Sequence, residues 1–197
     1  MAGLLNDKGD FTVKIGVISD THGCQEHWAK AYEKFFKDAD FIIHVGDVLY
    51  HGPRNPMLED YNPAGLAEKI NACPQPVLIC KGNCDSEVDQ LVLNMPIQSP
   101  YVHAFADGRH IVAVHGHTVE TDAEKDRMAE AIRADIFICG HVHVNVLEKR
   151  GNTVFLNPGS PSLSKREDGR QTCAVIENDG IRIFDIDSGE VVMEMDL

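Results

Sequence analysis

Six short apolar runs recur along this chain, and each of them ends in a polar motif. The runs cover residues 14–19, 41–45, 77–81, 111–114, 136–139 and 153–156. Continuous apolar runs of this length are typical of β-strands that are buried on both faces. Helical patterns between the first three runs indicate parallel strands joined by crossover helices. The sequence therefore predicts an α/β fold.

The helices are indicated by apolar residues at intervals of three and four. Such residues occupy 28–36, recur more weakly around Leu66 and Ile70, and recur again in 122–134. This spacing places them on one face of a helix. Asp122 is the candidate N-cap of the third helix.

The second half of the chain indicates antiparallel strands. Asp107-Gly108 lies between two apolar runs and predicts a hairpin, and residues 150–152 predict another turn. The C-terminal segment from residue 172 has the pattern of an antiparallel meander. We therefore expect two mixed β-sheets packed as a sandwich and flanked by helices. Residues 1–197 are expected to form a single domain, with 1–12 as an N-terminal extension.

Composition limits the classes of partner. Lys and Arg total 18 and Asp and Glu total 31, a formal charge of −13, which disfavours nucleic-acid polymers and anionic membranes. No apolar stretch approaches the roughly 20 residues of a membrane span, and the first residues lack the apolar core of a signal peptide. The six cysteines contain no CxxC pair. A cytoplasmic protein is expected, and exposed edges of the meander would allow a homo-oligomer.

Side chains that can bind metal ions follow the predicted strands. They are Asp20, His22, Asp47, Asn83, His115, His141 and His143. Ligands of α/β sheets bind beyond the carboxyl ends of the strands, so motifs far apart in sequence would converge there. The mixture of carboxylate, imidazole and amide groups suits two adjacent divalent cations with open positions for a substrate.

Each motif taken alone has a simpler interpretation. Asp20 could be only a helix N-cap, Gly46-Asp47 only a turn, and a lone histidine after a buried strand is usually a core residue. The whole set favours the ligand interpretation. The histidines at 27, 44, 51, 103 and 110 are assigned to packing or the surface, and His117 to the surroundings of the site or to solvent. Asp85 is expected to cap a short helix, and residues 157–160 to form a turn near the site.

The motifs DxH, GD, GN(H/C), HG and GHxH occur in this order over residues 14–160. In this they resemble the calcineurin-like metallophosphoesterase superfamily. The longer stretches GDVLYHGPRNP and GNCDSEVDQ are similar to a bacterial phosphodiesterase branch of it. The resemblance implies a four-layer α/β/β/α fold, a small-molecule phosphoester substrate and two divalent metal ions. Manganese is the implied metal, with Fe²⁺, Zn²⁺ and Ni²⁺ as alternatives.

The resemblance also implies a division of the ligands. Asp20, His22, Asp47 and His143 would hold the first metal. Asp47, Asn83, His115 and His141 would hold the second, so Asp47 would bridge the two. A hydroxide between the metals would attack phosphorus in line.

Cys84 departs from the common pattern of the superfamily. Most members carry histidine at this point of the GNH motif, where it resembles a general acid or a phosphate contact. A thiol lacks the reach and the cationic form of imidazole. With Cys84 and Asp47 as candidate catalytic residues, we expect a preference for diesters with good leaving groups. Asn83 is a candidate for substrate binding, as are Arg54 and His51 in the long irregular segment 48–63.

Three functions fit these observations. The first is hydrolysis of phosphodiesters. The second is a phosphomonoesterase or dinucleoside polyphosphate hydrolase with the same fold. The third is a noncatalytic protein-binding scaffold, which the presence of residues able to bind metal at all seven ligand positions disfavours.

Overall fold

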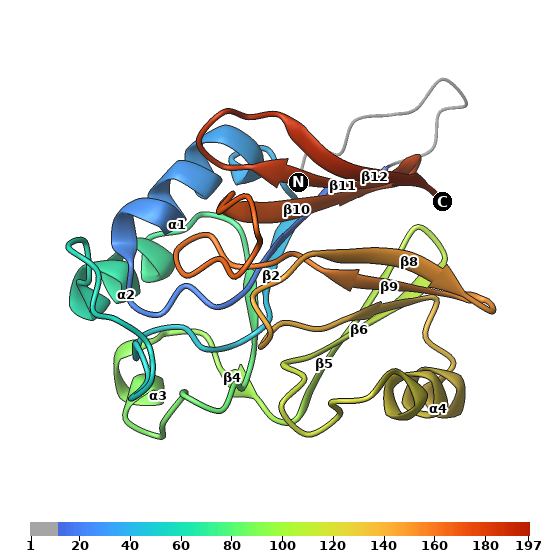
Figure 1. Cartoon of the computed structure of the whole chain (residues 1–197), viewed down its shortest axis with the longest axis horizontal. Coiled ribbons are helices and arrows are strands. Elements are labelled where there is room, and N and C mark those ends of the chain that lie inside the picture. The colour runs from blue at the N-terminus through green and yellow to red at the C-terminus, as the bar shows by residue number, and fades with distance from the viewer. Residues whose placement is uncertain (1–11) are drawn as a thin grey trace.

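The computed structural model describes residues 12–197, and their strands form two mixed sheets (Figure 1). Residues 1–11 of the predicted N-terminal extension lie outside the described residues. The first sheet has the order β12 (Val191–Asp196), β11 (Gly180–Asp185), β10 (Thr172–Glu177), β1 (Ile15–Ile18), β2 (Phe41–His44), β3 (Val77–Cys80) and β4 (Ile97–Gln98). The second has the order β5 (Tyr101–Ala106), β6 (Arg109–Val114), β7 (Ile136–Ile138), β9 (Thr153–Asn157) and β8 (Val146–Arg150).

The pairing within each sheet follows the sequence patterns. Strands β1, β2, β3 and β4 run parallel, whereas β10, β11 and β12 form the predicted antiparallel meander. In the second sheet β6, β7 and β9 run parallel, with hairpin partners β5 and β8 at the edges. Both predicted hairpin turns are confirmed.

Alternating side chains of the strands build the layers. Ile15 and Val17 of β1 pack between the two sheets, together with Ile111 and Ile136 of the second sheet. Ile18 faces the opposite side and packs with the helices. Full burial of each such aliphatic side chain contributes about 1.5–3 kcal/mol. The predicted sandwich of two mixed sheets is confirmed.

Helices cover both outer faces (Figure 1). α1 (Gln25–Ala31), the π-helical turn η1 (Tyr32–Phe36) and α2 (Pro63–Asn71) pack on the first sheet. α4 (Asp122–Ile132) packs on the second sheet. The short α3 (Asp89–Val92) lies at the lower left of Figure 1. The arrangement is the expected four-layer α/β/β/α fold.

Two details of the helices differ from expectation. The helix predicted over 28–36 changes from α to π at Tyr32, so that Phe36 is buried while Phe35 stacks on Phe184 with ring centroids 4.6 Å apart. The prediction that Asp122 caps α4 was wrong. Thr121 is the N-cap and forms a capping box with Glu124, because its hydroxyl accepts the Glu124 backbone N–H.

The long irregular segment follows Asp47 as predicted and ends where α2 begins at Pro63. An isolated β-bridge between Tyr61 and Cys24 ties its end to the first motif. Within the described residues, no helix is long and apolar enough to cross a bilayer. The single-domain assignment stays a prediction.

Candidate metal centre and substrate cleft

The loops after β1, β2, β6 and β7 bring the predicted ligands together at the carboxyl ends of both sheets. Asp20 is fully buried, and its Oδ1 lies 3.1 Å from Nε2 of His143 and 3.7 Å from Nε2 of His22. His22 and His143 are 121 residues apart, yet their Nε2 atoms are separated by only 3.2 Å. Asp20, His22 and His143 thus form one compact group of ligand atoms.

Asp47 lies between this group and a second one. Its Oδ2 is 3.8 Å from Nε2 of His22 and 3.4 Å from Nε2 of His115. Nε2 of His115 is in turn 3.1 Å from Oδ1 of Asn83. The carboxylate of Asp47 therefore reaches one histidine of each group, as a bridging ligand would.

His141 approaches the second group less directly. Its ring centroid lies 5.2 Å from that of His115, and its side chain lines the adjoining cleft. Its backbone N–H donates a hydrogen bond of 3.0 Å to Oδ2 of Asp20. No hydrogen bond or ion pair joins its ring to the other described ligands.

Three histidines are oriented for metal binding by backbone carbonyls. Nδ1 of His22 lies 2.8 Å from the carbonyl oxygen of Tyr50, and the corresponding partners are Val45 for His115 and Leu163 for His143. A carbonyl only accepts, so each Nδ1 carries a proton and each Nε2 faces the centre. Such outer contacts are usual for metal-ligating histidines.

The donor set fits divalent cations. The lone pairs of His22 and His143 face each other at 3.2 Å, an arrangement that a cation between them would stabilise. Oδ1 of Asp20 is buried and makes no hydrogen bond among the described residues. A buried carboxylate oxygen without a hydrogen-bond partner is costly, and coordination to a cation would relieve that cost.

The backbone at the centre is strained. Five of the seven predicted ligands have φ in the left-handed region, at 55° for Asp20, 46° for His22, 56° for Asp47, 69° for His141 and 61° for His143. Residues other than glycine adopt this conformation rarely, at a cost of about 1–3 kcal/mol each. Strain gathered on these residues indicates that the rest of the fold holds them in place for function.

The charges of the centre favour cations. Burial raises the pKa of Asp47, but its hydrogen bond with His115 and the charge of that imidazole outweigh burial and lower the pKa overall. Burial lowers the pKa of His115, yet the Asp47 hydrogen bond and the Asp20 and Asp47 charges raise it to about 9. Two ionised carboxylates therefore lie within the site, and a cation bound at His115 would replace its second proton.

A cleft of about 860 Å³ opens beside the centre. His22, Asp47, Asn83, His141 and His143 line it, as does Cys84. Two cations, Arg54 and Lys165, lie on its rim and form no ion pair among the described residues. His51 is not part of this lining. Its ring packs edge-on against Tyr50 and Tyr61, with centroids 4.7 Å and 5.1 Å away.

The sequence agrees with one family model over residues 13–180, and that model describes the calcineurin-like phosphoesterase superfamily domain.

The chain belongs to the calcineurin-like phosphoesterase superfamily.

Individual relatives agree with this assignment. The chain is 31% identical to phosphodiesterase YfcE of Escherichia coli K12 over 184 residues, which cover 93% of this chain and 97% of YfcE. It is 28% identical to the probable metallophosphoesterase YsnB of Bacillus subtilis, over 91% of this chain and 95% of YsnB. The structure of E. coli YfcE, described as a phosphoesterase, matches with a TM-score of 0.81 at 30% identity, covering 93% of this chain and 99% of that chain.

A more distant match shows the fold alone. Vps29 of Entamoeba histolytica, solved with Zn²⁺, has a TM-score of 0.67 at 18% identity, covering 93% of this chain and 99% of Vps29. The same fold thus occurs in a protein of widely different sequence.

Asp85 holds two motifs of the superfamily together, which the sequence did not reveal. Its carboxylate accepts hydrogen bonds from the backbone N–H groups of Asp47 at 2.9 Å, Val48 at 2.7 Å and Gly82 at 2.7 Å. The expectation that it caps a helix was wrong, because α3 begins after Val88 without a side-chain cap. Burial and the charge of Asp47 raise the pKa of Asp85 to about 6 despite these three donors.

Replacing Asp85 with asparagine is expected to destabilise the protein by about 1–3 kcal/mol. The two carboxylate oxygens together accept three N–H groups, and an amide would place its own N–H₂ against at least one of them. The free energy of unfolding in urea measures the effect.

Asp185→Asn is the matched control. Asp185 is also buried, but one oxygen accepts both of its backbone donors, Asp187 N–H at 2.8 Å and Ser188 N–H at 2.9 Å. An asparagine carbonyl can keep both bonds. Equal losses of stability in the two variants would contradict the role assigned to Asp85.

His44 and Thr21 form a second buried brace of the metal centre. Nδ1 of His44 accepts the Gly46 N–H at 3.2 Å, so Nε2 carries the proton and donates to the Thr21 hydroxyl at 2.9 Å. That hydroxyl donates to the Val48 carbonyl at 2.9 Å. Burial lowers the pKa of His44 to about 3, which keeps it neutral. His44 is thus a buried residue, as expected, and with Thr21 it links the loops that carry Asp20 and Asp47.

The turn at 157–160 also supports the site. The Ser160 and Ser162 hydroxyls donate to the Asp20 carbonyl at 2.8 Å and 3.1 Å. Asn157 donates through Nδ2 to the Gly140 carbonyl at 2.8 Å. These contacts fix the backbone around Asp20 and before His141.

Proposed function

We propose that this protein hydrolyses phosphodiesters of small molecules with the help of two divalent cations. The superfamily assignment and the similarity to YfcE make it a metal-dependent phosphodiesterase. The observation that carries the proposal is the buried cage of Asp20, His22, Asp47, His115 and His143, in which Asp47 reaches both histidine groups.

In this proposal the cations divide the cage in two. Asp20, His22, Asp47 and His143 hold one cation. Asp47, Asn83, His115 and His141 hold the other. When bound, the pair would supply an activated water as nucleophile and neutralise charge on the phosphoryl oxygens. Manganese is the metal we propose, and the same donors suit Fe²⁺, Zn²⁺ and Ni²⁺.

The chain's own residues then bind and orient the diester. Arg54 and Lys165 line the cleft as cations in a protein with a formal charge of −13, and they would attract the phosphate there. Asn83 reaches the cleft from the loop after β3 and would contact the phosphate as well. His51 receives no role in this proposal. Residence in the cytoplasm and association into a homo-oligomer stay predictions of the sequence.

The proposal is tested with protein freed of metal. Mn²⁺ is then added, and turnover of bis(4-nitrophenyl) phosphate is compared with that of 4-nitrophenyl phosphate. Faster hydrolysis of the diester is expected. A preference for the monoester would favour the phosphomonoesterase, and loss of all turnover despite bound metal would favour the noncatalytic scaffold.

Cys84 is proposed to limit the range of leaving groups. Its thiol lines the cleft beside Asp47, whose Oδ1 accepts the Cys84 backbone N–H at 2.8 Å. Burial and the negative charge of Asp47 raise the pKa of this thiol to about 12, which leaves it a neutral and weak proton donor. Esters whose leaving group departs without protonation would therefore react best.

Cys84→His is expected to improve alkyl phosphodiesters relative to aryl ones by about tenfold or more, since a positioned general acid contributes that much or more. The ratio of kcat/KM for the two substrates is the measurement. Cys84→Ser is the control, because it removes the thiol without supplying an imidazole. An unchanged ratio in the histidine variant would refute the role proposed for Cys84.

A further inference from the structure

A second hollow of about 600 Å³ lies next to the substrate cleft. Tyr50, Cys84 and Ser86 line both spaces, so the hollow adjoins the cleft. We call it the apolar groove. Its walls include Leu49, Tyr61, Ala64, Ala67 and Val92, which come from the irregular segment, α2 and α3.

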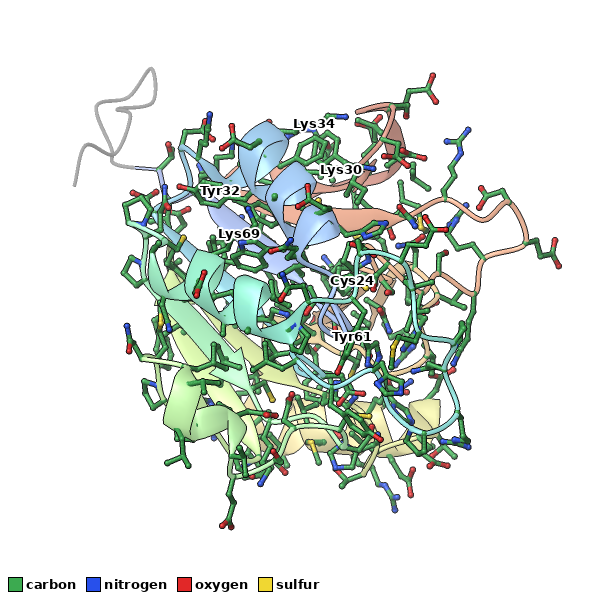
Figure 2. All side chains as sticks on the ribbon, turned by 90° about the vertical axis from the view of Figure 1, so that its left-hand side faces the viewer. Cys24, Lys30, Tyr32, Lys34, Tyr61 and Lys69 are labelled. Carbon is green, nitrogen blue, oxygen red and sulfur yellow. The ribbon has the colours of Figure 1, made fainter. Side chains whose placement is uncertain are left out.

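Two aromatic side chains line the groove and can contact a ring-shaped group. Tyr50 stands at the junction with the cleft and is 42% exposed, so its ring is accessible to a bound group. Tyr61 lies further along the groove, at the foot of α2 and close to Cys24, as Figure 2 shows. Aromatic side chains prefer other rings as neighbours, with stacked or edge-on contacts.

The polar groups of the groove are mostly engaged elsewhere. The Asp89 carboxylate accepts the Ser86 backbone N–H at 2.8 Å and the Ser86 hydroxyl at 3.1 Å. Asn71 donates to the Val92 carbonyl at 2.7 Å and accepts the Asn94 N–H at 2.8 Å. The groove therefore suits an uncharged apolar group better than a sugar or a second phosphate.

We infer that the apolar groove receives the leaving group of the phosphodiester, and that this group carries an aromatic ring. The inference rests on the proposed function. A phosphate at the metal centre has Cys84 at its edge, and the groove begins at Cys84. A leaving group placed there would be held by contact with Tyr50 and Tyr61, and the volume falls within the usual range for small-molecule sites.

Ala64→Gln is the variant that tests this inference. Ala64 is exposed at the first turn of α2, away from the metal centre, so the longer polar side chain can be accommodated by the fold and would occupy the groove. Val92→Ser on α3 removes apolar surface from the groove by a different route. Lys69→Gln is the matched control, because Lys69 is an exposed residue of α2 that does not line the groove.

Affinity is measured as inhibition of bis(4-nitrophenyl) phosphate turnover by methyl phenyl phosphate and by dimethyl phosphate. The wild type is expected to bind the phenyl ester more tightly by about tenfold, as burial of one ring allows. Ala64→Gln and Val92→Ser should remove most of this preference and leave the affinity for dimethyl phosphate unchanged. Lys69→Gln should retain the preference.

A second readout separates the groove from the reaction. Saturation-transfer NMR on the Zn²⁺-loaded protein detects contact with the phenyl ring without any turnover. If Ala64→Gln abolishes the ring contacts, the groove is supported even when no diester is hydrolysed. The absence of hydrolysis would contradict the proposed function alone. Normal turnover with an unchanged phenyl preference in both groove variants, or ring contacts insensitive to Ala64→Gln, would overturn the inference.

Discussion

Asp47→Asn is expected to lower kcat/KM on phosphodiesters by about 100-fold or more, a larger loss than a change outside the ligand set usually causes. Oδ2 of Asp47 is within 3.8 Å of His22 and 3.4 Å of His115, so one oxygen serves both halves of the cage. An amide is a neutral and weaker ligand, and it would weaken both cation positions at once. The centre would also lose one of its two buried negative charges.

The measurement combines metal content by mass spectrometry with steady-state kinetics. We expect the variant to retain fewer cations per chain than the wild type under the same dialysis. Asp185→Asn is the control, because Asp185 is a buried aspartate outside the proposed ligand set, and it should match the wild type in both respects. A fully active variant with undiminished metal content would disprove the shared position of Asp47.

Gly82→Ala is expected to displace the Asp47 carboxylate by steric crowding. A Cβ at this position would collide with Oδ1, Cγ and the backbone nitrogen of Asp47. These atoms cannot retreat, because Asp85 and Cys84 bind the backbone N–H and Oδ1 of Asp47. Overpacking of this kind costs about 1–3 kcal/mol of stability, and the displaced carboxylate should also weaken metal binding.

Urea unfolding of the cation-free protein and calorimetric titration with Mn²⁺ measure the two effects separately. Gly151→Ala is the control, since Gly151 has φ of +58° but no atom within 4 Å of an added Cβ. That variant should lose only about 1–2 kcal/mol to backbone strain and keep its metal affinity. Wild-type metal affinity in Gly82→Ala would show that Asp47 tolerates the added methyl group.

The sequence determined the layers and the composition of the metal centre. Runs such as 111–114 and 136–139 are apolar throughout because both faces of those strands are covered. Asp20 and His115 follow such a run directly, Asp47 follows one after a single glycine, and the ends of parallel strands meet at one edge. The local pattern and the family resemblance were therefore sufficient to propose these candidates before any distance was known.

Only the tertiary structure decided how these ligands are held. Asp85 looks like a helix cap in its own segment, but two of its three backbone partners lie on the loop after β2, almost 40 positions away in the chain. His44 reads as a packing residue until its bonds to Thr21 and Gly46 are seen. The left-handed backbone conformation of Asp20 and His143 likewise could not be predicted from the sequence.

The apolar groove belongs to the same class of feature. Its walls come from the segment before α2, from α2 itself and from α3, which share no motif and no common spacing. A periodic pattern reports which face of one element is buried, but not which space two elements leave between them. The seven candidate ligands could thus be proposed from the sequence. The hydrogen bonds that support them and the groove beside them exist only once the two sheets and their helices have packed.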